Sequence, residues 1–540
     1  MTMNRKKFAF LLALPLIIVG CKKAPDVKVV DIELDGEYLT LFGQYEEFSY
    51  EGLEVYALFS NSKKKQVTDF EVSSPDMTVL GTQDVEVTYK DFTKSYSIEI
   101  EYRNNHERGI IQYTMPASLN EELEEYQIKV NYHNDYFRHS ATELNDDLKM
   151  LSFGSAVVSD SVARASAFFG GMFFDDFVYY DYDEITENTI GHFFAHKEID
   201  EFELYAVSIR GFEYQAEWAN NFLIGESGDH YGFGLRANEV FGHLVAYINT
   251  YHTPDKTVKI WISGYSRAGA MSDFVSMKLM TTHVFNVGQD TLYTYTFEAP
   301  ASVTAEHKEG YPNVFNFYNS TDLIPYIPPQ QYGLYRTGTD IDIYVANVGD
   351  LVANFDSAIE IPAFTAKSDK YSNAQEFNAY FIELMLEDTG NEGSMHSRQD
   401  YVDHYQSDLS YLISLLFTLP PETNAKVMAA LQDIGGDALS IITGGNPLYQ
   451  KVKTILDEDG VPYDDAKLES STGKLCLFIK THFSFLGGSL INELISIEWG
   501  LPPSVGVNQA TLDNISRAVT MHYPEITYCL ISNANFYSGE

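Results

Sequence analysis

The sequence predicts an α/β fold preceded by a small all-β domain. From about residue 125 onwards, apolar strand patterns alternate with amphipathic helix patterns, the order typical of an α/β sheet. Residues 27–102 instead contain several short alternating runs separated by turn signals, as in a β-sandwich. A chain of 540 residues, 45% of them hydrophobic, can form more than one core. We therefore expect domains over residues 27–102 and 110–540, the second with a helical insertion or cap over about 350–510.

The formal net charge of −41 restricts the partners of the protein. It disfavours nucleic acid, because a basic stripe is needed to neutralise phosphates. It also disfavours docking onto anionic lipid through general charge. The charge fits the solubilising surface of an exported acidic protein, and the sequence leaves the oligomeric state open.

The N-terminus resembles a signal peptide. Residues 1–21 read MTMNRKKFAFLLALPLIIVGC, a basic start followed by an apolar run that is too short to span a bilayer. The end of this run, Ile18-Val19-Gly20-Cys21, resembles the lipobox of bacterial lipoproteins. The resemblance implies that residues 1–20 are removed and that Cys21 is lipidated, at the extracytoplasmic face of a bacterial cell membrane. A plain secretory signal or an uncleaved anchor is the alternative.

Cys476 and Cys529 are the remaining cysteines. Export permits a disulfide, but the spacing of the two residues does not decide whether they meet. The sequence shows no CxxC pair and no metal-ligand cluster. We therefore expect neither a metal nor an organic cofactor.

Residues 27–102 alternate as half-buried strands do, for example at Val85, Val87 and Tyr89. The stretches EEFSYEGLEVYALFSNSKKKQVTDFEV and GTQDVEVTYKDFTKSYSIEI resemble bacterial Ig-like surface domains. Such domains are usually spacers or adhesion modules, so the resemblance implies no chemistry in this part of the chain.

Residues 257–275, TVKIWISGYSRAGAMSDFV, contain the pattern on which the functional prediction depends. An apolar strand leads to Gly264, Ser266 follows, and a helix-like pattern starts at Ala270. A serine on a tight turn between a strand and a helix is how an α/β-hydrolase presents its nucleophile. We therefore predict an α/β-hydrolase fold with Ser266 as the nucleophile.

The neighbours of Ser266 fit this turn with one departure. Positions two before and two after the serine must be small, and Ala268 places a methyl group where a second glycine is usual. The backbone N–H of Arg267 would lie at the start of the helix, where it can stabilise a negative oxygen.

A second set of motifs precedes the serine. A buried strand leads into Arg210-Gly211-Phe212, which is followed by Trp218, Asn221-Phe222 and Asp229-His230-Tyr231-Gly232-Phe233. Together with the serine turn, this order resembles the class 3 lipase family of α/β-hydrolases, and most closely a branch of exported bacterial lipase-like proteins. The resemblance covers residues 125–345 densely and the C-terminal segment more thinly.

The resemblance gives Phe212 a role. In the lipase family the residue after Arg-Gly supplies an N–H to the oxyanion hole, usually from a Ser or Thr whose hydroxyl also helps. Phe212 keeps the backbone donor and lacks the hydroxyl. Loss of one such donor can cost about 3 kcal/mol of transition-state stabilisation. The departure therefore bears on efficiency more than on reaction class.

The same family places its catalytic acid in an Asp-x-(Val/Ile)-Pro setting. Here a strand is followed by Asp322-Leu323-Ile324-Pro325, so the resemblance implies that Asp322 is the acid. A surface aspartate in a turn is the alternative.

Four histidines follow Asp322, as the order Ser, Asp, His of this fold requires. His522 precedes Pro524-Glu525, a setting that closes the chain in the lipase-like branch, and the resemblance implies that it is the base. His396 is the alternative base, because its spacing from Asp322 is nearer to that usual in the family. The four residues are His396, His404, His482 and His522.

Two amphipathic helices are expected in the insertion. Ser372-Asn373-Ala374-Gln375 resembles a capping box before the first helix, and the second carries Tyr401 to Leu416 and ends before Pro420. These helices could form a lid over the serine or could be structural packing only.

The sequence thus predicts a lipid-anchored serine hydrolase that cleaves carboxylic esters, with Ser266, Asp322 and His522 as the triad. Its partners would be an ester or lipid substrate and a membrane. The alternative is a non-catalytic surface binding lipoprotein on a hydrolase scaffold, which the departures at Phe212 and Ala268 motivate.

Overall fold

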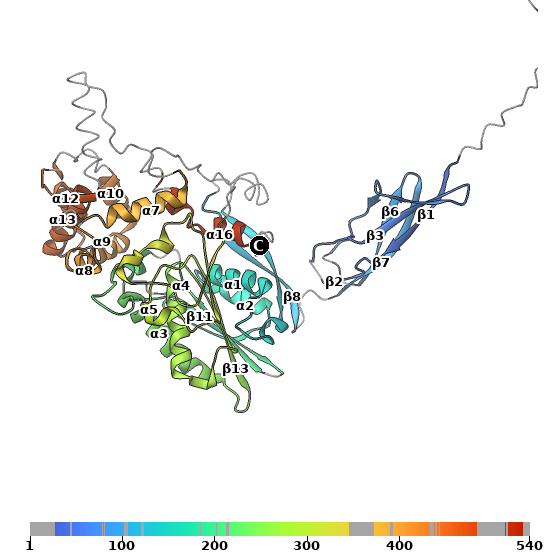
Figure 1. The fold of residues 1–540 in the computed structure, drawn as a ribbon, viewed down its shortest axis with the longest axis horizontal. Helices are drawn as coiled ribbons and strands as arrows, with labels where there is room; N and C mark the ends of the chain where they lie inside the picture. The colour runs from blue at the N-terminus through green and yellow to red at the C-terminus, as the bar shows by residue number, and fades with distance from the viewer. Residues whose placement is uncertain are drawn as a thin grey trace, which may run out of the picture. The chain divides into compact units, whose positions relative to one another are not determined.

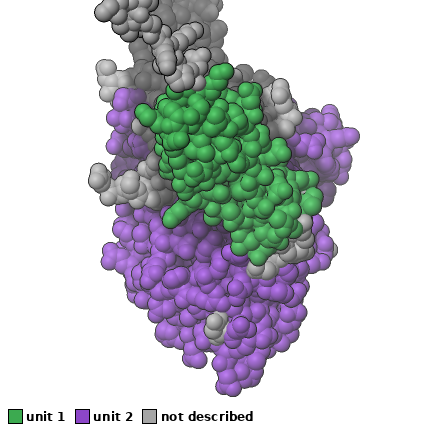
Figure 2. Space-filling view, turned by 90° about the vertical axis from the view of Figure 1, so that its right-hand side faces the viewer, with its two compact units in different colours: residues 1–103 green, residues 104–540 purple. Residues whose placement is uncertain are grey.

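The computed structural model in Figure 1 describes most of the chain between residues 27 and 532. The described residues fall into two compact units, one within residues 1–103 and the other within residues 104–540, coloured separately in Figure 2. The residues outside the description are 1–26, 44–45, 78, 80, 102–105, 120–123, 184, 201, 212–214, 345–371, 389–392, 433–436, 438–439, 442, 483–513, 515–516 and 533–540.

The first unit consists of two small sheets. Burial alternates along β6, where Val85, Val87 and Tyr89 are buried and the residues between them are not, as expected for a sheet with one face on a core. One sheet has the order β1 (Val29–Gly36), β3 (Leu53–Phe59), β4 (Lys64–Val67); the other has the order β2 (Leu41–Gly43), β7 (Phe92–Glu101), β6 (Gly81–Tyr89), β5 (Glu71–Val72). The resemblance to Ig-like domains stays a prediction.

The second unit is built on a mixed seven-stranded sheet, which confirms the α/β class. The first two strand pairs are antiparallel and the remaining four are parallel. The strands follow one another in chain order across the sheet: β10 (Asp175–Tyr180), β11 (His192–Ile199), β12 (Phe202–Ile209), β13 (Thr257–Tyr265), β14 (Leu292–Phe297), β15 (Val314–Tyr318) and β16 (Thr339–Asp342). The parallel strands end at one edge of the sheet, where open α/β sheets bind ligands.

One face of this sheet is covered by two long helices, α3 (Tyr231–Tyr251) and α4 (Arg267–Thr282). Ile260 and Ile262 of β13 point to this face and are fully buried. Helix α4 begins at Arg267, three residues before the predicted start at Ala270. The carbonyl of Ser266 already accepts the N–H groups of Gly269 and Ala270, so the first turn forms before the apolar pattern begins.

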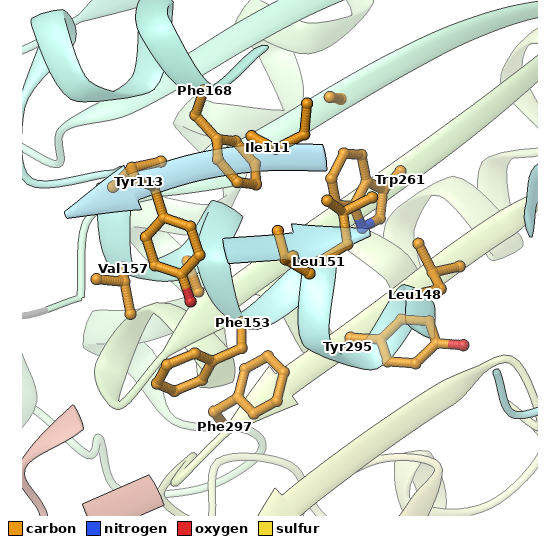
Figure 3. Packing of buried hydrophobic residues seen from close by; sticks show 14 of the residues in the cluster. Ile111, Tyr113, Leu148, Leu151, Phe153, Val157, Phe168, Trp261, Tyr295 and Phe297 are labelled. Carbon is orange, nitrogen blue, oxygen red and sulfur yellow. The ribbon is translucent and has the colours of Figure 1, made fainter. Parts of the chain in front are cut away.

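The other face carries the aromatic core (Figure 3). Trp261 of β13 points to this side, opposite its neighbours Ile260 and Ile262, because side chains alternate along a strand. Phe153 and Phe297 meet edge to face with ring centres 5.2 Å apart. The covering elements are the hairpin β8 (Arg108–Pro116) and β9 (Glu125–His133), and the helices α1 (Asp146–Val158), α2 (Val162–Gly171) and α16 (Pro524–Ile531).

The predicted insertion contains a group of helices, which we call the cap (Figure 1). Helix α9 (Gln406–Thr418) packs against the 3-10 helix η2 (Gln215–Phe222), which follows β12. Tyr401 donates a hydrogen bond to the carbonyl of Phe222 at 2.9 Å, and Arg398 binds the carbonyls of residues 224, 225 and 228. The cap helices are α7 (Ala374–Met385), α8 (Arg398–His404), α9 (Gln406–Thr418), α10 (Pro421–Gln432), α12 (Pro447–Asp459) and α13 (Asp465–His482).

The cap differs from the prediction in two local details. The N-cap of α7 is Asn373 rather than Ser372, and its side chain accepts the N–H of Glu376 at 2.9 Å. The carboxylate of Glu376 binds Ser372 in turn, which shifts the capping contacts by one residue. The single helix predicted over Tyr401 to Leu416 is two helices, because the backbone leaves helical geometry at Tyr405 (φ −127°).

Several predictions concern the N-terminus and the cysteines. The signal-like segment and Cys21 lie outside the described residues. Among the described helices, none combines the length and the apolar character needed to cross a membrane. Cys476 on α13 and Cys529 on α16 are separate buried thiols, so they do not form a disulfide.

Candidate active site

Ser266 occupies a strained turn at the end of β13. Its backbone has φ 56° and ψ −130°, a conformation that residues other than glycine adopt rarely. The N–H of Ser266 donates to the carbonyl of Phe297 at the end of β14, 2.7 Å away. The neighbouring strand therefore holds the strained residue in place and leaves its side chain at the edge of the sheet.

The turn is possible because small residues surround it. A Cβ atom on Gly264 would lie 2.4 Å from the carbonyl oxygen of Ala268, and one on Gly211 would lie 1.9 Å from that of Tyr265. The methyl of Ala268 would lie only 3.2 Å from a Cβ on Gly211. Glycine at position 211 therefore leaves the space that the methyl of Ala268 uses, which explains how the departure at Ala268 is tolerated.

Asp322 is fully buried in the turn that follows β15. Its N–H donates to the carbonyl of Asn319 at 2.9 Å, which closes the turn. Its Oδ1 accepts the N–H of Ile324 at 2.9 Å, and its Oδ2 lies 2.5 Å from Nδ1 of His522. The carboxylate is thus oriented from the backbone on one side and faces the imidazole on the other.

His522 bridges the serine and the aspartate. Its Nε2 lies 2.7 Å from Oγ of Ser266, and its Nδ1 faces Asp322. The hydroxyl of Tyr265, the residue before the serine, donates to the carbonyl of His522 at 2.7 Å. The structure therefore brings together Ser266, Asp322 and His522 in the relation that a Ser-His-Asp triad requires.

His396, the alternative base, lies in the cap between α7 and α8. Its Nδ1 is 2.9 Å from the carbonyl of Leu386, the residue that follows α7. The structure pairs it with this helix end and with neither Ser266 nor Asp322.

The structure describes one of the two predicted oxyanion donors. Arg267 is the first residue of α4, so its N–H has no acceptor within the helix and is available at the positive end of the helix dipole. Phe212 lies outside the described residues.

The side chain of Arg267 turns away from the serine into a buried ion cluster that the sequence analysis did not find. Glu217 of η2 pairs with both Arg267 and Arg210, and all three side chains are buried. Burial lowers the pKa of Arg267, and the charge of Glu217 opposes that effect. Since a buried charge is tolerated only when it is paired, the cluster ties the end of β12, η2 and the serine turn together.

The sequence holds only a weak signal for this cluster. Arg210 follows a buried strand directly, and an arginine needs a partner when it is buried, but nothing in the sequence identifies Glu217 as that partner.

A largely apolar cavity of 480 Å³ opens onto the triad. Ser266 and His522 line it together with side chains from η2, from the loop after Asp322 and from the cap. Its volume is within the range of small-molecule sites. The apolar lining includes Trp218, Phe222, Ile327, Met385, Leu409 and Phe478.

Among the described residues, no group of three or more His, Cys, Asp or Glu side chains is arranged to hold a metal ion.

The model of the lipase (class 3) family matches residues 206–332, a segment that includes the serine turn and Asp322 and ends before His522. Over this segment the predicted resemblance to class 3 lipases is confirmed, and it supports an ester-hydrolysing enzyme of the lipase type. The more specific resemblance to a bacterial lipoprotein branch stays a prediction. No curated protein matches the sequence.

Similar solved structures include three fungal lipases. Lipase II from Rhizopus niveus is 14% identical over 36% of this chain and 79% of its own, with a TM-score of 0.30. The triacylglyceride lipase of Rhizomucor miehei is 14% identical over 37% and 82%, with a TM-score of 0.28. The lipase from Rhizopus microsporus var. chinensis is 15% identical over 44% and 83%, with a TM-score of 0.28.

Proposed function

We propose that the protein is a lipid-anchored, exported serine hydrolase that cleaves carboxylic esters. The observation that carries the proposal is the position of His522, within hydrogen-bond distance of both Ser266 and Asp322. These residues come from segments far apart in the chain, and their contact is the geometry that activates a serine for attack on an acyl group.

The first half of the reaction forms an acyl-enzyme. Oγ of Ser266 attacks the ester carbonyl while Nε2 of His522 takes its proton, and the buried charge of Asp322 stabilises the imidazolium. The N–H of Arg267 stabilises the tetrahedral oxyanion, with the N–H of Phe212 as the expected second donor. The intermediate collapses, and His522 donates the proton to the departing alcohol.

The second half releases the acid. A water molecule gives a proton to Nε2 of His522 and attacks the acyl carbonyl. Collapse of the second tetrahedral intermediate breaks the bond to Oγ of Ser266, which takes the proton back from His522. The free acid leaves and the enzyme returns to its starting state.

The cavity supports an apolar acyl group. Its lining has few polar groups apart from those at the triad, so it favours a hydrocarbon chain over a charged or sugar group. The apolar surface of Met385, Leu409 and Phe478 comes from the cap. The cap would then select the acyl group.

Membrane attachment rests on the lipobox-like end of the signal segment at Cys21. We expect a fatty-acid label to be incorporated by the full-length protein in a bacterial host and not by the Cys21→Ser variant. Equal labelling of the two proteins would contradict lipidation at this residue.

The activity is tested with p-nitrophenyl esters from acetyl to dodecanoyl. The full-length protein in detergent micelles should hydrolyse them, and Ser266→Ala should lower kcat by a factor on the order of 10⁶. Ser263→Ala is a matched control, because its hydroxyl contacts Ser155 inside the unit rather than His522. Equal rates for wild type and Ser266→Ala would refute the proposal, as would a folded wild type that hydrolyses none of the esters.

A further inference from the structure

Glu298 is a buried carboxyl group beside the triad that the reaction described above does not use. It follows β14 directly, adopts φ 51° and is fully buried. Its side chain lies against that of Asp322. Residue 298 also follows Phe297, whose carbonyl holds the N–H of Ser266.

The Glu298 carboxyl contacts both segments that carry the other triad members. Its Oε2 accepts the N–H of Asn319 at 2.9 Å, in the turn that presents Asp322. Its Oε1 lies 3.0 Å from Oγ1 of Thr527 on α16, the helix that follows His522. One side chain therefore links the turn of the acid to the helix of the base.

A chain of hydroxyl groups continues from Glu298 to the base. Oγ1 of Thr527 lies 3.0 Å from the hydroxyl of Tyr265, which donates to the carbonyl of His522. Thr527 donates its hydroxyl proton to Oε1 of Glu298, so this contact does not use a proton of the carboxyl group. Two ionised carboxylates have no proton between them, so a hydrogen bond between Glu298 and Asp322 requires one of the two to be protonated.

The surroundings determine which of the two carboxyls carries the negative charge. Asp322 faces two hydrogen-bond partners, Nδ1 of His522 and the N–H of Ile324. Within the described part of the chain, no ion pair joins Glu298 to a basic side chain. Burial, and then the charge of Asp322, raise the pKa of Glu298 well above its ordinary value. Among the described residues, the titratable groups that face Glu298 are Asp322, Tyr265 of β13 and Tyr318 of β15. His522 contacts Asp322, and Glu525 of α16 faces Tyr265.

We propose that Glu298 is a neutral carboxylic acid that hydrogen bonds to Asp322 and holds the segments of the nucleophile, acid and base in register. It acts through Asp322 and His522 and touches no substrate, so it is a positioning residue. The inference rests on the proposed function for its catalytic consequence, whereas the protonation state of Glu298 can be measured independently of catalysis.

The protonation state of Glu298 determines how the Glu298→Gln substitution affects the midpoint of the His522 titration. An ionised Glu298 would add a second negative charge near the imidazolium, and its removal in Glu298→Gln would lower the midpoint of the His522 titration by about one pH unit or more. A neutral Glu298 contributes no such charge. Glu298→Gln would then leave the midpoint unchanged within the error of the titration.

The test follows the low-field proton resonance of His522 Nδ1–H against pH in the full-length protein, with His522→Ala to assign the signal. Glu298→Gln, Glu298→Ala and Asp273→Asn are compared with wild type. Asp273→Asn is the matched control, because it also converts a buried carboxyl to an amide and lies seven residues beyond Ser266 on α4. Tryptophan fluorescence verifies folding of each variant.

The expected results separate the two proposals. An unchanged midpoint in Glu298→Gln supports the neutral acid, and a midpoint lowered by about one pH unit or more overturns it. The rate of Ser266 labelling by a fluorophosphonate should fall by up to about 100-fold in Glu298→Ala, with most of it restored in Glu298→Gln. An unrestored rate in a folded Glu298→Gln would contradict the positioning role. Absence of labelling in wild type would overturn the proposed function. The pH titration of the His522 resonance would still show whether Glu298 is protonated.

Discussion

The catalytic edge of the sheet and the cap-lined cavity differ in how they are built. At the edge, Ser266, Asp322 and His522 each have a particular hydrogen-bond partner, and glycine is required at positions where a Cβ atom would meet a carbonyl oxygen. The cavity is lined by apolar side chains whose contribution depends on area and shape. Small substitutions at the edge should therefore cause large losses of activity or stability. Substitutions in the cavity should change activity by smaller factors, and only for some substrates.

The largest effect is expected at the acid of the triad. Asp322→Asn removes the carboxylate that stabilises the imidazolium and should lower kcat by about 10⁴-fold with little effect on folding. The measurement is ester hydrolysis with the soluble product followed over time. Asp255→Asn, in an exposed turn, should retain wild-type activity. A loss of less than tenfold in Asp322→Asn would show that Asp322 is not the acid.

A second change tests the tight backbone of the edge. Gly211→Ala would place a Cβ atom 1.9 Å from the carbonyl oxygen of Tyr265 and should destabilise the unit by about 3 kcal/mol. Urea unfolding followed by tryptophan fluorescence measures this, because all three tryptophans lie within residues 104–540.

Gly242→Ala is its control, with the opposite expected sign. Apart from the backbone of α3 itself, no described atom lies within 4 Å of a Cβ placed there, and Gly242 is inside α3, so alanine should stabilise the helix by about 1 kcal/mol. If Gly211→Ala unfolds at the same urea concentration as wild type, the backbone of Tyr265 does not approach residue 211 as closely as described.

A third change tests the cavity. Leu409→Ala should lower kcat/KM for a dodecanoyl ester by about tenfold and leave the acetyl ester unaffected, because only the long chain reaches the lost surface. Leu431→Ala truncates a cap leucine that packs inside the helix group and should not change the preference. Equal losses for both esters in Leu409→Ala would mean that the acyl chain does not occupy this cavity.

The smallest effect concerns the pH dependence of stability. Burial raises the pKa of Asp273 well above its ordinary value, so the folded protein keeps a proton that the unfolded chain releases above pH 4. Stability should therefore fall as pH rises, by about 1 kcal/mol per pH unit for this group, up to its folded pKa. Asp273→Asn removes this contribution, and its urea midpoint should fall less than that of wild type between pH 5 and pH 7. Parallel midpoints in the two proteins would show that Asp273 is ionised in the fold.

The local motifs of the edge were predictable from the sequence. A strand, Ser266 and a helix must be adjacent in the chain, and Asp322 lies at the end of the next strand but one, so short patterns identify both. His522 is 200 residues beyond Asp322, and its contact with the triad depends on the fold of everything between them. Only a short motif distinguished it from His396.

Other features could not be predicted because they depend on tertiary contacts. Glu217 and Glu298 are ordinary acidic residues in the sequence, and only the structure shows that one is shared by two arginines and that the other lies against Asp322. The break between α8 and α9 at Tyr405 is similar, since the hydroxyl of Tyr405 binds the carbonyl of Gly393 in the buried interior. The apolar spacing continues across the break.

The most direct test of the triad is fluorophosphonate labelling with the modified residue mapped by mass spectrometry. Wild type and His396→Ala should be labelled on Ser266, whereas Ser266→Ala should lose the label and His522→Ala should react far more slowly. These results would establish that the contact of His522 with Ser266 activates the nucleophile. Undiminished labelling of His522→Ala, or loss of the label in His396→Ala, would contradict the account.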